Sequence, residues 1–347
     1  MKRATLTATL ALLLAAAAAA HAAVEGGWTV SRNKGDRETI QLEVSYEHSH
    51  HGQPMRIADL SGLSAAQVAS AAATPVSFSL QREAGTIRFE GTLRNGSGGG
   101  DFEFTPNPAY LDTLRGLGIR VSEGGRHGGD SVDERLLSLA MLDVSTEFIR
   151  SMKEIGYDES LDDYTAMRIF HVDPELVADF QRLGMRPTAD QLVASQIHGA
   201  TPEFIGRMRE LGLGSLHFDD YVAFRIHGVS PEFVKELGDL GYRDLRGDDL
   251  VAFRIHGVSP DFVRQLAELG YRDISADDLV AFRIHGVSPD FIKEIAELGY
   301  REVSADDLVA FRIHGVTPKF IRDLQADGYD DLSADDLVSM RIHGRHP

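Results

Sequence analysis

The chain has 347 residues, of which 43% are hydrophobic and 8% aromatic, and its formal net charge at pH 7 is −18. This apolar content is enough to build folded cores, so the composition excludes an intrinsically disordered chain. The negative charge argues against nucleic acid as a partner, because an acidic protein is repelled by phosphate backbones.

The N-terminus has the pattern of a secretory signal peptide. Lys2 and Arg3 precede an apolar, alanine-rich run, and Ala20-His21-Ala22 has the small-x-small pattern of a cleavage site. A membrane anchor is the alternative, but the run is short for a span and has no flanking stop-transfer charges. We therefore expect residues 1–22 to be cleaved near Ala22. The mature protein is then expected to be periplasmic or secreted, with no membrane span.

Residues 23–106 are expected to form a small antiparallel β domain. Alternating apolar and polar residues predict four strands, around Ile40–Tyr46, Val76–Leu80, Ile87–Phe89 and Phe102–Phe104. Asn95-Gly96 predicts a hairpin turn. We interpret Gly96–Gly100 as the tip of that hairpin, since it lacks the Lys-Ser/Thr of a phosphate-binding loop. Ser64–Ala73 predicts one short helix. Because the repeats follow directly, this domain is expected to cap them.

The remainder of the chain, residues 107–347, is built from one repeated unit. Asp-Asp-Leu-Val-Ala-Phe-Arg-Ile-His-Gly-Val-Ser-Pro recurs almost unchanged from Asp248, Asp277 and Asp306. Degenerate copies extend back to Pro108. One histidine per copy marks a constant 29-residue spacing, at His198, His227, His256, His285, His314 and His343. A fixed period of this length is typical of a solenoid.

Each unit predicts two short helices. Ser275 is a good N-cap for the first, which Gly286 ends. Ser288 and Pro289 begin the second, whose apolar residues form one narrow stripe. The predicted fold class is mostly α: a right-handed α-solenoid of two-helix, 28–29-residue repeats, preceded by a small antiparallel β domain. We expect eight helices of each type.

The histidines invite a metal-binding interpretation, because zinc prefers imidazole ligands. Equivalent positions in neighbouring repeats, however, lie about 8–10 Å apart, which is too far for two of them to share an ion. We therefore interpret them as structural, with each ring capping carbonyls in the last helical turn. His48, His50 and His51 lie in a predicted loop and are weak metal candidates, for which a solvated turn is the preferred interpretation. No cofactor is expected.

The repeat also carries one arginine per copy. On a helical wheel Arg283 falls inside the apolar arc, where a buried charge must be paired. We predict a ladder in which each arginine reaches acids or carbonyls of the adjacent repeat, interrupted where Gln196 replaces it. The predicted ladder positions are Arg225, Arg254, Arg283, Arg312 and Arg341.

The sequence offers little that predicts catalysis. It contains no HExxH, no GxSxG and no cysteine. The paired aspartates recur in the repeats at helix starts, whereas a catalytic centre normally occurs once. We therefore predict that the chain is not an enzyme. A hydrolase within the β domain is kept as a hypothesis, after the two given below, only because catalytic triads are recognised by their geometry and not by their sequence.

Two segments resemble a known family. The repeat, and the run Ala84-Gly85-Thr86…Glu90-Gly91…Gly100-Asp101-Phe102-Glu103-Phe104-Thr105-Pro106, are similar to extracytoplasmic repeat regions of some bacterial β-lactam-sensor-type membrane metallopeptidases. The resemblance covers approximately residues 74–343. The chain has neither the membrane helices nor the zinc-protease motif of those proteins, so no catalytic residue carries over. The resemblance implies a sensor-like appendage.

The predicted function is an exported, non-catalytic repeat module of the bacterial envelope, interacting with proteins or acting as a regulatory, sensor-like part. A protein or peptide partner is expected along the solenoid. The alternative is a periplasmic protein that binds a metal or small ligand through its repeat or loop histidines.

Overall fold

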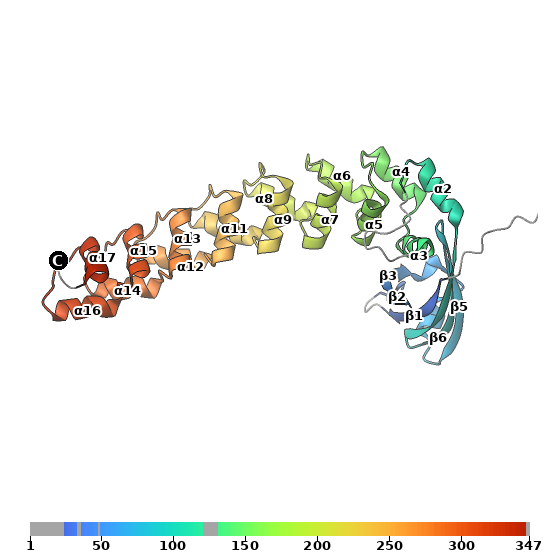
Figure 1. The fold of residues 1–347 in the computed structure, drawn as a ribbon, viewed down its shortest axis with the longest axis horizontal. Coiled ribbons are helices and arrows are strands. Elements are labelled where there is room, and N and C mark those ends of the chain that lie inside the picture. The colour runs from blue at the N-terminus through green and yellow to red at the C-terminus, as the bar shows by residue number, and fades with distance from the viewer. Residues whose placement is uncertain (1–23, 33–35, 48, 121–130, 345–347) are drawn as a thin grey trace, which may run out of the picture. The chain divides into compact units, whose positions relative to one another are not determined.

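The computed structural model describes residues 24–32, 36–47, 49–120 and 131–344. The expected signal peptide and the glycine-rich segment 123–129 lie outside these residues. The chain divides into two compact units, Met1–Ile169 and Phe170–Pro347. The strands and the first helices belong to the first unit, and helices α6 to α17 belong to the second (Figure 1). The predicted fold class, a helical repeat solenoid that follows an antiparallel β domain, is confirmed.

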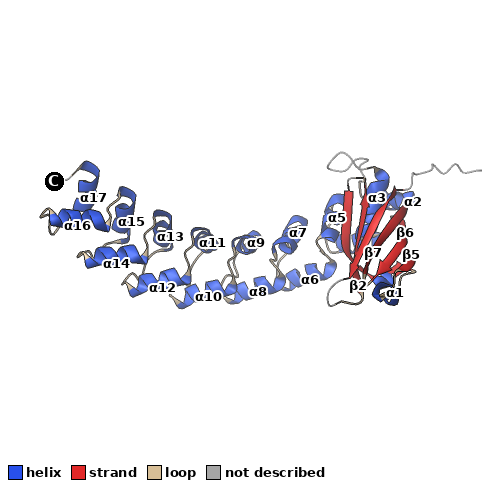
Figure 2. Ribbon diagram, turned by 90° about the horizontal axis from the view of Figure 1, so that it is seen from below, coloured by secondary structure: helices blue, strands red, loops and turns tan. Residues whose placement is uncertain are grey.

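The first unit contains one seven-stranded antiparallel sheet with the order β3-β2-β1-β7-β6-β5-β4. The strands are drawn in red in Figure 2. Their bounds are β1 (Val24–Arg32), β2 (Thr39–Tyr46), β3 (Ser49–Arg56), β4 (Leu60–Ser61), β5 (Thr74–Arg82), β6 (Gly85–Arg94) and β7 (Ser97–Pro106). A single 3₁₀ turn, η1 (Ile57–Asp59), precedes β4.

All four predicted strands are present, and their alternating apolar residues are buried. The turn at Asn95-Gly96 is also confirmed, because both residues have positive φ, 52° and 80°. Around Trp28 the core is aromatic: Phe78 lies 5.2 Å from its ring and stacks on Phe89 at 4.7 Å. Cross-strand aromatic pairs of this kind contribute to sheet stability.

Strands β1 and β3 and the two-residue β4 were not predicted from the pattern. In β1 the alternation begins only at Trp28, because Gly26 and Gly27 precede it. In β3 only Met55 is buried, and Pro54 has no backbone N–H to donate to a neighbouring strand. Such a polar strand is stable here because β3 lies at the sheet edge, where one side needs no partner.

The interpretation of Gly96–Gly100 as a hairpin tip was wrong beyond Gly96. The residues from Ser97 to Gly100 belong to β7 and pair with β6 and β1. A Cβ at Gly100 would lie 2.0 Å from the carbonyl oxygen of Glu90, and one at Gly98 would lie 2.1 Å from that of Thr92. The glycines therefore permit close backbone approach within the sheet.

Helices complete the first unit. The helix predicted in the alanine-rich stretch is α1 (Ala65–Ala69), which begins with a capping box between Ser64 and Gln67. Helix α3 packs against β1, β6 and β7. The first repeats are therefore part of the same compact unit as the sheet, and the boundary between the units falls inside the array.

The repeats contain two kinds of helix. We call those that end in or near the Arg-Ile-His-Gly sequence A helices, and those that begin near the proline B helices. The A helices are α3 (Val132–Leu142), α5 (Leu161–Ile169), α7 (Ala189–His198), α9 (Phe218–His227), α11 (Gly247–His256), α13 (Ala276–His285), α15 (Ala305–His314) and α17 (Ala334–His343). The B helices are α2 (Pro108–Gly116), α4 (Thr146–Glu154), α6 (Pro174–Arg182), α8 (Pro202–Glu210), α10 (Pro231–Asp239), α12 (Pro260–Glu268), α14 (Pro289–Glu297) and α16 (Pro318–Ala326).

The predicted caps are present. The hydroxyl of Ser275 accepts a hydrogen bond from the backbone N–H of Asp278 at 3.1 Å and begins α13. Gly286 ends that helix with φ of 74°, the left-handed conformation that glycine adopts at low cost. Ser288 accepts from the N–H of Phe291 at 3.1 Å and begins α14. Both helix types therefore begin and end where the repeated polar residues and glycines place them.

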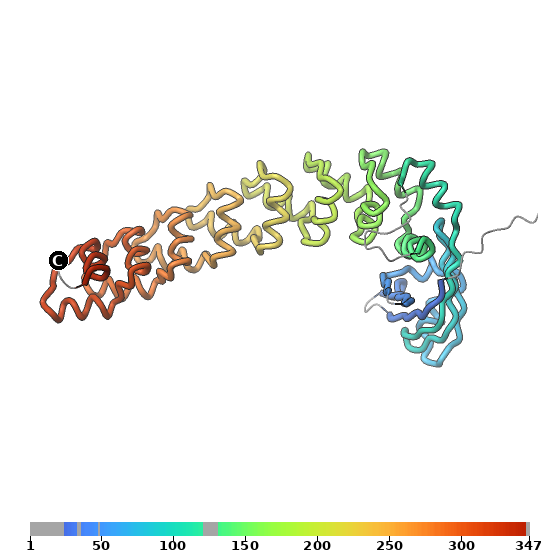
Figure 3. The backbone as a smooth tube through the Cα atoms, in the orientation of Figure 1, coloured from blue at the N-terminus to red at the C-terminus, as the bar shows by residue number. Residues whose placement is uncertain are grey.

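In the second unit the helices form two layers (Figure 2). A helices pack against A helices, and B helices against B helices. The backbone alternates between the layers once per repeat (Figure 3). Leu279 and Phe282 of α13 and Ile295 of α14 are fully buried. Tyrosine hydroxyls add bonds between repeats, as from Tyr271 to the carbonyl of Val303 at 2.7 Å. No helix in the described part of the chain has the length and apolarity needed to cross a membrane.

Candidate binding surface

A row of exposed isoleucines follows the A helices of the second unit. One isoleucine per repeat lies between the repeated arginine and histidine, and its side chain is 51–57% exposed. The row consists of Ile197, Ile226, Ile255, Ile284, Ile313 and Ile342. In the first unit, Ile169 occupies the same repeat position and is 47% exposed. Exposed apolar residues scattered singly are ordinary, but a regular row of them is unusual and makes this face the candidate binding surface. We call the six residues of the second unit the isoleucine row.

This row was not predicted from the sequence. At 100° per residue, however, Ile284 is about 140° from Leu279 around the helix, and it is also far from Phe282. A helical wheel of the repeat already separates Ile284 from the buried face. The angular position of Ile284 on the helix would therefore have identified the row from the sequence.

The repeated arginines contact the preceding repeat. The Nε–H groups of Arg225, Arg283 and Arg312 each donate to the backbone carbonyl of a histidine 27 residues earlier, at 3.4 Å. Each of the five guanidinium groups also stacks on a B-helix phenylalanine, with 4.9–5.1 Å between the guanidinium carbon and the ring centroid. Such cation–π contacts are worth about 0.5–1 kcal/mol at exposed sites. The acceptors in the ladder are therefore carbonyls and aromatic rings.

The expectation that these arginines lie inside the apolar arc was wrong. Arg283, like the other four, is exposed, and its guanidinium carbon lies 5.0 Å from the centroid of the Phe262 ring. In the described chain, none of the five has a carboxylate within ion-pair distance. Gln196, which replaces the arginine in its repeat, makes no equivalent bond among the described residues.

The repeated histidines use their backbone and not their rings. The carbonyls of His198, His256 and His285 accept the arginine hydrogen bonds. All six side chains are exposed. Within the described part of the chain their rings make no hydrogen bond, so the predicted capping of carbonyls by the rings is not what the structure shows. Each of these histidines directly follows an isoleucine of the row in sequence.

His48, His50 and His51 do not form a common site among the described residues. His48 itself lies outside them. His50 and His51 lie in strand β3 and not in a loop, so that prediction was wrong. Consecutive strand residues point to opposite faces, and the two rings therefore diverge. Nε2 of His51 is 3.1 Å from the hydroxyl of Tyr46 and 3.3 Å from that of Ser138. His51 thus connects the sheet to α3.

The described residues contain no group of three or more histidine, cysteine or acidic side chains placed to hold a metal ion. An acidic cluster lies on the sheet, around a depression of about 520 Å³. Glu25 is paired with Glu103 across strands, and Glu90 with Asp101, while Arg88 is the one cation among the residues that line it. Like charges in opposite positions destabilise a sheet.

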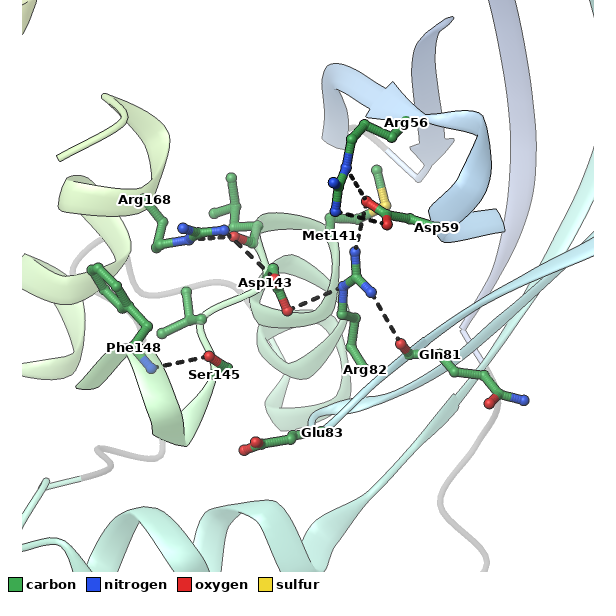
Figure 4. Close-up of polar contacts among 12 residues, drawn as sticks. Arg56, Asp59, Gln81, Arg82, Glu83, Met141, Asp143, Ser145, Phe148 and Arg168 are labelled. Carbon is green, nitrogen blue, oxygen red and sulfur yellow. Dashed lines mark hydrogen bonds and ion pairs between the residues drawn. The ribbon is translucent and has the colours of Figure 1, made fainter. Parts of the chain in front are cut away.

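A polar network joins strand β5 to helices α3 and α5 in the first unit (Figure 4). Arg82 contacts Asp143 at 3.1 Å and Asp59 at 3.7 Å. Asp143 also pairs with Arg168 at 3.6 Å, and Nε–H of Arg168 donates to the carbonyl of Leu142 at 3.0 Å. Asp143 has φ of 53° and occupies the left-handed position that glycine holds in later repeats. The network is therefore a modified form of the arginine ladder that also binds the sheet.

Glu83 completes this junction. Its carboxylate accepts from the backbone N–H of Thr146 at 3.0 Å and from the Thr146 hydroxyl at 3.1 Å, at the start of α4. The Tyr110 hydroxyl donates to the carbonyl of Val144. Burial, with Glu83 and Asp143 nearby, raises the pKa of Tyr110, so its hydroxyl stays a donor. These residues hold the first unit together and leave the isoleucine row as the candidate for binding.

Neither a protein-family model nor a curated protein matches this chain.

Proposed function

We propose that this chain is an exported, non-catalytic repeat protein of the bacterial envelope that binds a protein or peptide along the isoleucine row. A regulatory or sensor-like role is the form that the resemblance of its repeats implies. The row itself supports the proposal most strongly. Six isoleucines recur at one position with their side chains half exposed, and packing within the array does not require an isoleucine there.

The energetics of the row support binding distributed over several repeats. Complete burial of an isoleucine side chain is worth about 1.5–3 kcal/mol, so covering the exposed half contributes about 1 kcal/mol per repeat. Six such contacts give about 6 kcal/mol before the cost of association is subtracted. Because association costs about 4–15 kcal/mol, a ligand must span several repeats and add polar contacts to bind, and one that touches a single repeat gains too little.

The repetition also favours binding over catalysis. In successive repeats the isoleucine of the row is preceded by an arginine, or by Gln196 in one repeat, and followed by a histidine. A catalytic constellation needs different groups that converge on one point. A linear array of identical contacts suits an extended partner instead.

Affinity capture from an envelope extract of the source bacterium tests the proposal. The full chain is compared with a variant in which Ile226, Ile255 and Ile284 are replaced by serine. The matched control is Gln265→Ser, Lys293→Ser and Glu294→Ser, three exposed B-helix positions whose replacement leaves the net charge unchanged. We expect a protein that the native chain and the control retain and the isoleucine variant loses. Equal retention by all three would refute binding along the row.

A further inference from the structure

The charges beside the isoleucine row identify the chemistry of the partner. Resting on the proposed function, we propose that the row binds an extended, acidic protein segment that carries apolar side chains at regular intervals. The observation behind this is a line of cations that parallels the isoleucines. Arg225, Arg254, Arg283 and Arg312 each precede an isoleucine of the row in sequence, and all are exposed.

Several other cations of the second unit have a carboxylate partner. Arg264 pairs with Asp261, Lys235 with Asp239 at 2.8 Å, and Arg246 with Asp249 at 3.1 Å. The ladder arginines have no carboxylate partner in the described part of the chain, although the protein has 53 acidic residues and 35 lysines and arginines. Arg209, Arg243 and Arg272 share this property and donate to backbone carbonyls. The ladder arginines are set apart by their position, because each directly precedes an isoleucine of the row. A partner that covers the row can therefore supply the carboxylates that these arginines lack.

The charges are distributed unevenly along each A helix. In α13, Asp277 and Asp278 occupy the first turn, and Arg283 and His285 occupy the last. Each A helix of this type is therefore acidic at its start and basic at its end. The helix dipole leaves negative charge at the last turn, but the Arg312 Nε–H group bound to the carbonyl of His285 offsets it. The remaining N–H groups of that guanidinium can bind a carboxylate.

The spacing of the row fits an extended ligand. Neighbouring helices pack about 8–10 Å apart, so the isoleucines recur at about that interval. A polyproline-II segment rises about 9.3 Å over three residues and returns to the same face. A β-strand repeats its face every two residues, at about 6.6 Å, which does not match. One apolar and one acidic residue in every three would then meet one isoleucine and one arginine per repeat.

Other occupants fit less well. A membrane surface would need a broad apolar face, whereas the row is only one isoleucine wide. A second copy of the chain would have to place an acidic apolar surface on the row. The described B helices instead expose polar residues such as Lys293, Glu294 and Glu297. An acidic segment of another protein therefore suits the row best.

Fluorescence anisotropy with defined peptides tests the inference. The probe is labelled (Glu-Pro-Leu)6, titrated with the full chain, and the comparison peptides are (Lys-Pro-Leu)6 and (Glu-Pro-Ser)6. We expect the probe to bind at least about tenfold more tightly than either, and more weakly as salt rises, because exposed charges are screened. Replacing Ile226, Ile255 and Ile284 by serine, or Arg225, Arg254 and Arg283 by glutamine, should weaken binding about tenfold or more. The Gln265, Lys293 and Glu294 control should bind like the native chain.

Circular dichroism of each variant shows whether it is folded, and only folded variants are compared. Binding of (Lys-Pro-Leu)6 equal to that of the probe would overturn the acidic chemistry. So would a folded arginine variant that binds the probe as tightly as the native chain does. An isoleucine-dependent dimer in sedimentation would assign the row to a second copy. Isoleucine-dependent binding to vesicles of phosphatidylcholine and phosphatidylglycerol would assign it to a membrane. If no peptide binds but capture from the extract still requires the isoleucines, the proposed function stands and the partner chemistry is wrong.

Discussion

The two compact units use their residues in opposite ways. In Phe170–Pro347 nearly every contact recurs, so one repeat describes the others. In Met1–Ile169 the important contacts occur once, as with Trp28 in the sheet or Glu83 at the start of α4. Repetition separates two kinds of position in the second unit. Phe282 recurs and is buried, so packing explains it, whereas Ile284 recurs and is exposed, so packing does not.

The largest expected effect is on the array core. Phe282→Ala removes a fully buried ring and should cost about 3–5 kcal/mol of unfolding free energy. Urea denaturation followed by far-UV circular dichroism measures the helices. Trp28, the only tryptophan, is 2% exposed in the sheet, so its fluorescence reports the first unit alone. We expect the circular dichroism transition to move and the fluorescence transition to stay. The reciprocal variant, Phe89→Ala, should move the fluorescence transition.

A smaller effect is expected at the left-handed helix ends. Gly286 has φ of 74°, and a Cβ there would lie 3.1 Å from a guanidinium nitrogen of Arg312. Gly286→Ala should cost about 1–2 kcal/mol, because alanine is strained in this conformation. Asparagine and aspartate adopt the left-handed conformation more readily than alanine, and Asp143 does so at the end of α3. Gly286→Asn should therefore cost less than Gly286→Ala. Equal losses for the two variants in thermal denaturation would contradict this explanation.

The junction in the first unit should respond by about 1 kcal/mol. Glu83→Ala removes the acceptor for the backbone N–H of Thr146, and loss of a helix cap typically costs that much. Glu83→Gln keeps an acceptor oxygen and should cost less. Trp28 fluorescence during denaturation gives both values. If both variants are as stable as the native chain, the contact does not stabilise the unit.

The smallest effect on stability is expected in the isoleucine row. Ile255→Ser changes a side chain that is 57% exposed, and exposed substitutions usually change the unfolding free energy by less than about 0.5 kcal/mol. Its effect on thermal denaturation should be far below that of Phe282→Ala. A loss of several kcal/mol would show that the row has a structural role after all.

The repeats could be predicted because capping serines, aspartates, prolines and glycines return at fixed spacing. Each copy of the repeat therefore indicates the same helix starts and helix ends. Strands β1 and β3 could not, since Gly26 and Gly27 interrupt one pattern and an edge position permits the polar composition of the other. The contact of Arg82 with Asp143 joins residues distant in sequence and occurs once, so no periodicity announces it. For the candidate binding surface, the contact of Arg283 with the preceding repeat was predicted, but its side chain was placed inside the apolar arc, and the exposed Ile284 beside it was not recognised.

Site-specific photo-crosslinking tests most directly whether the isoleucine row contacts a partner. A photoreactive amino acid is placed in turn at Ile255, Ile284 and Ile313, and for comparison at the exposed B-helix positions Gln265 and Glu294, in the full chain produced in its source bacterium. We predict the same crosslinked protein from all three row positions and none from the two comparison positions. Crosslinks from Gln265 and Glu294 with none from the row would contradict the central claim.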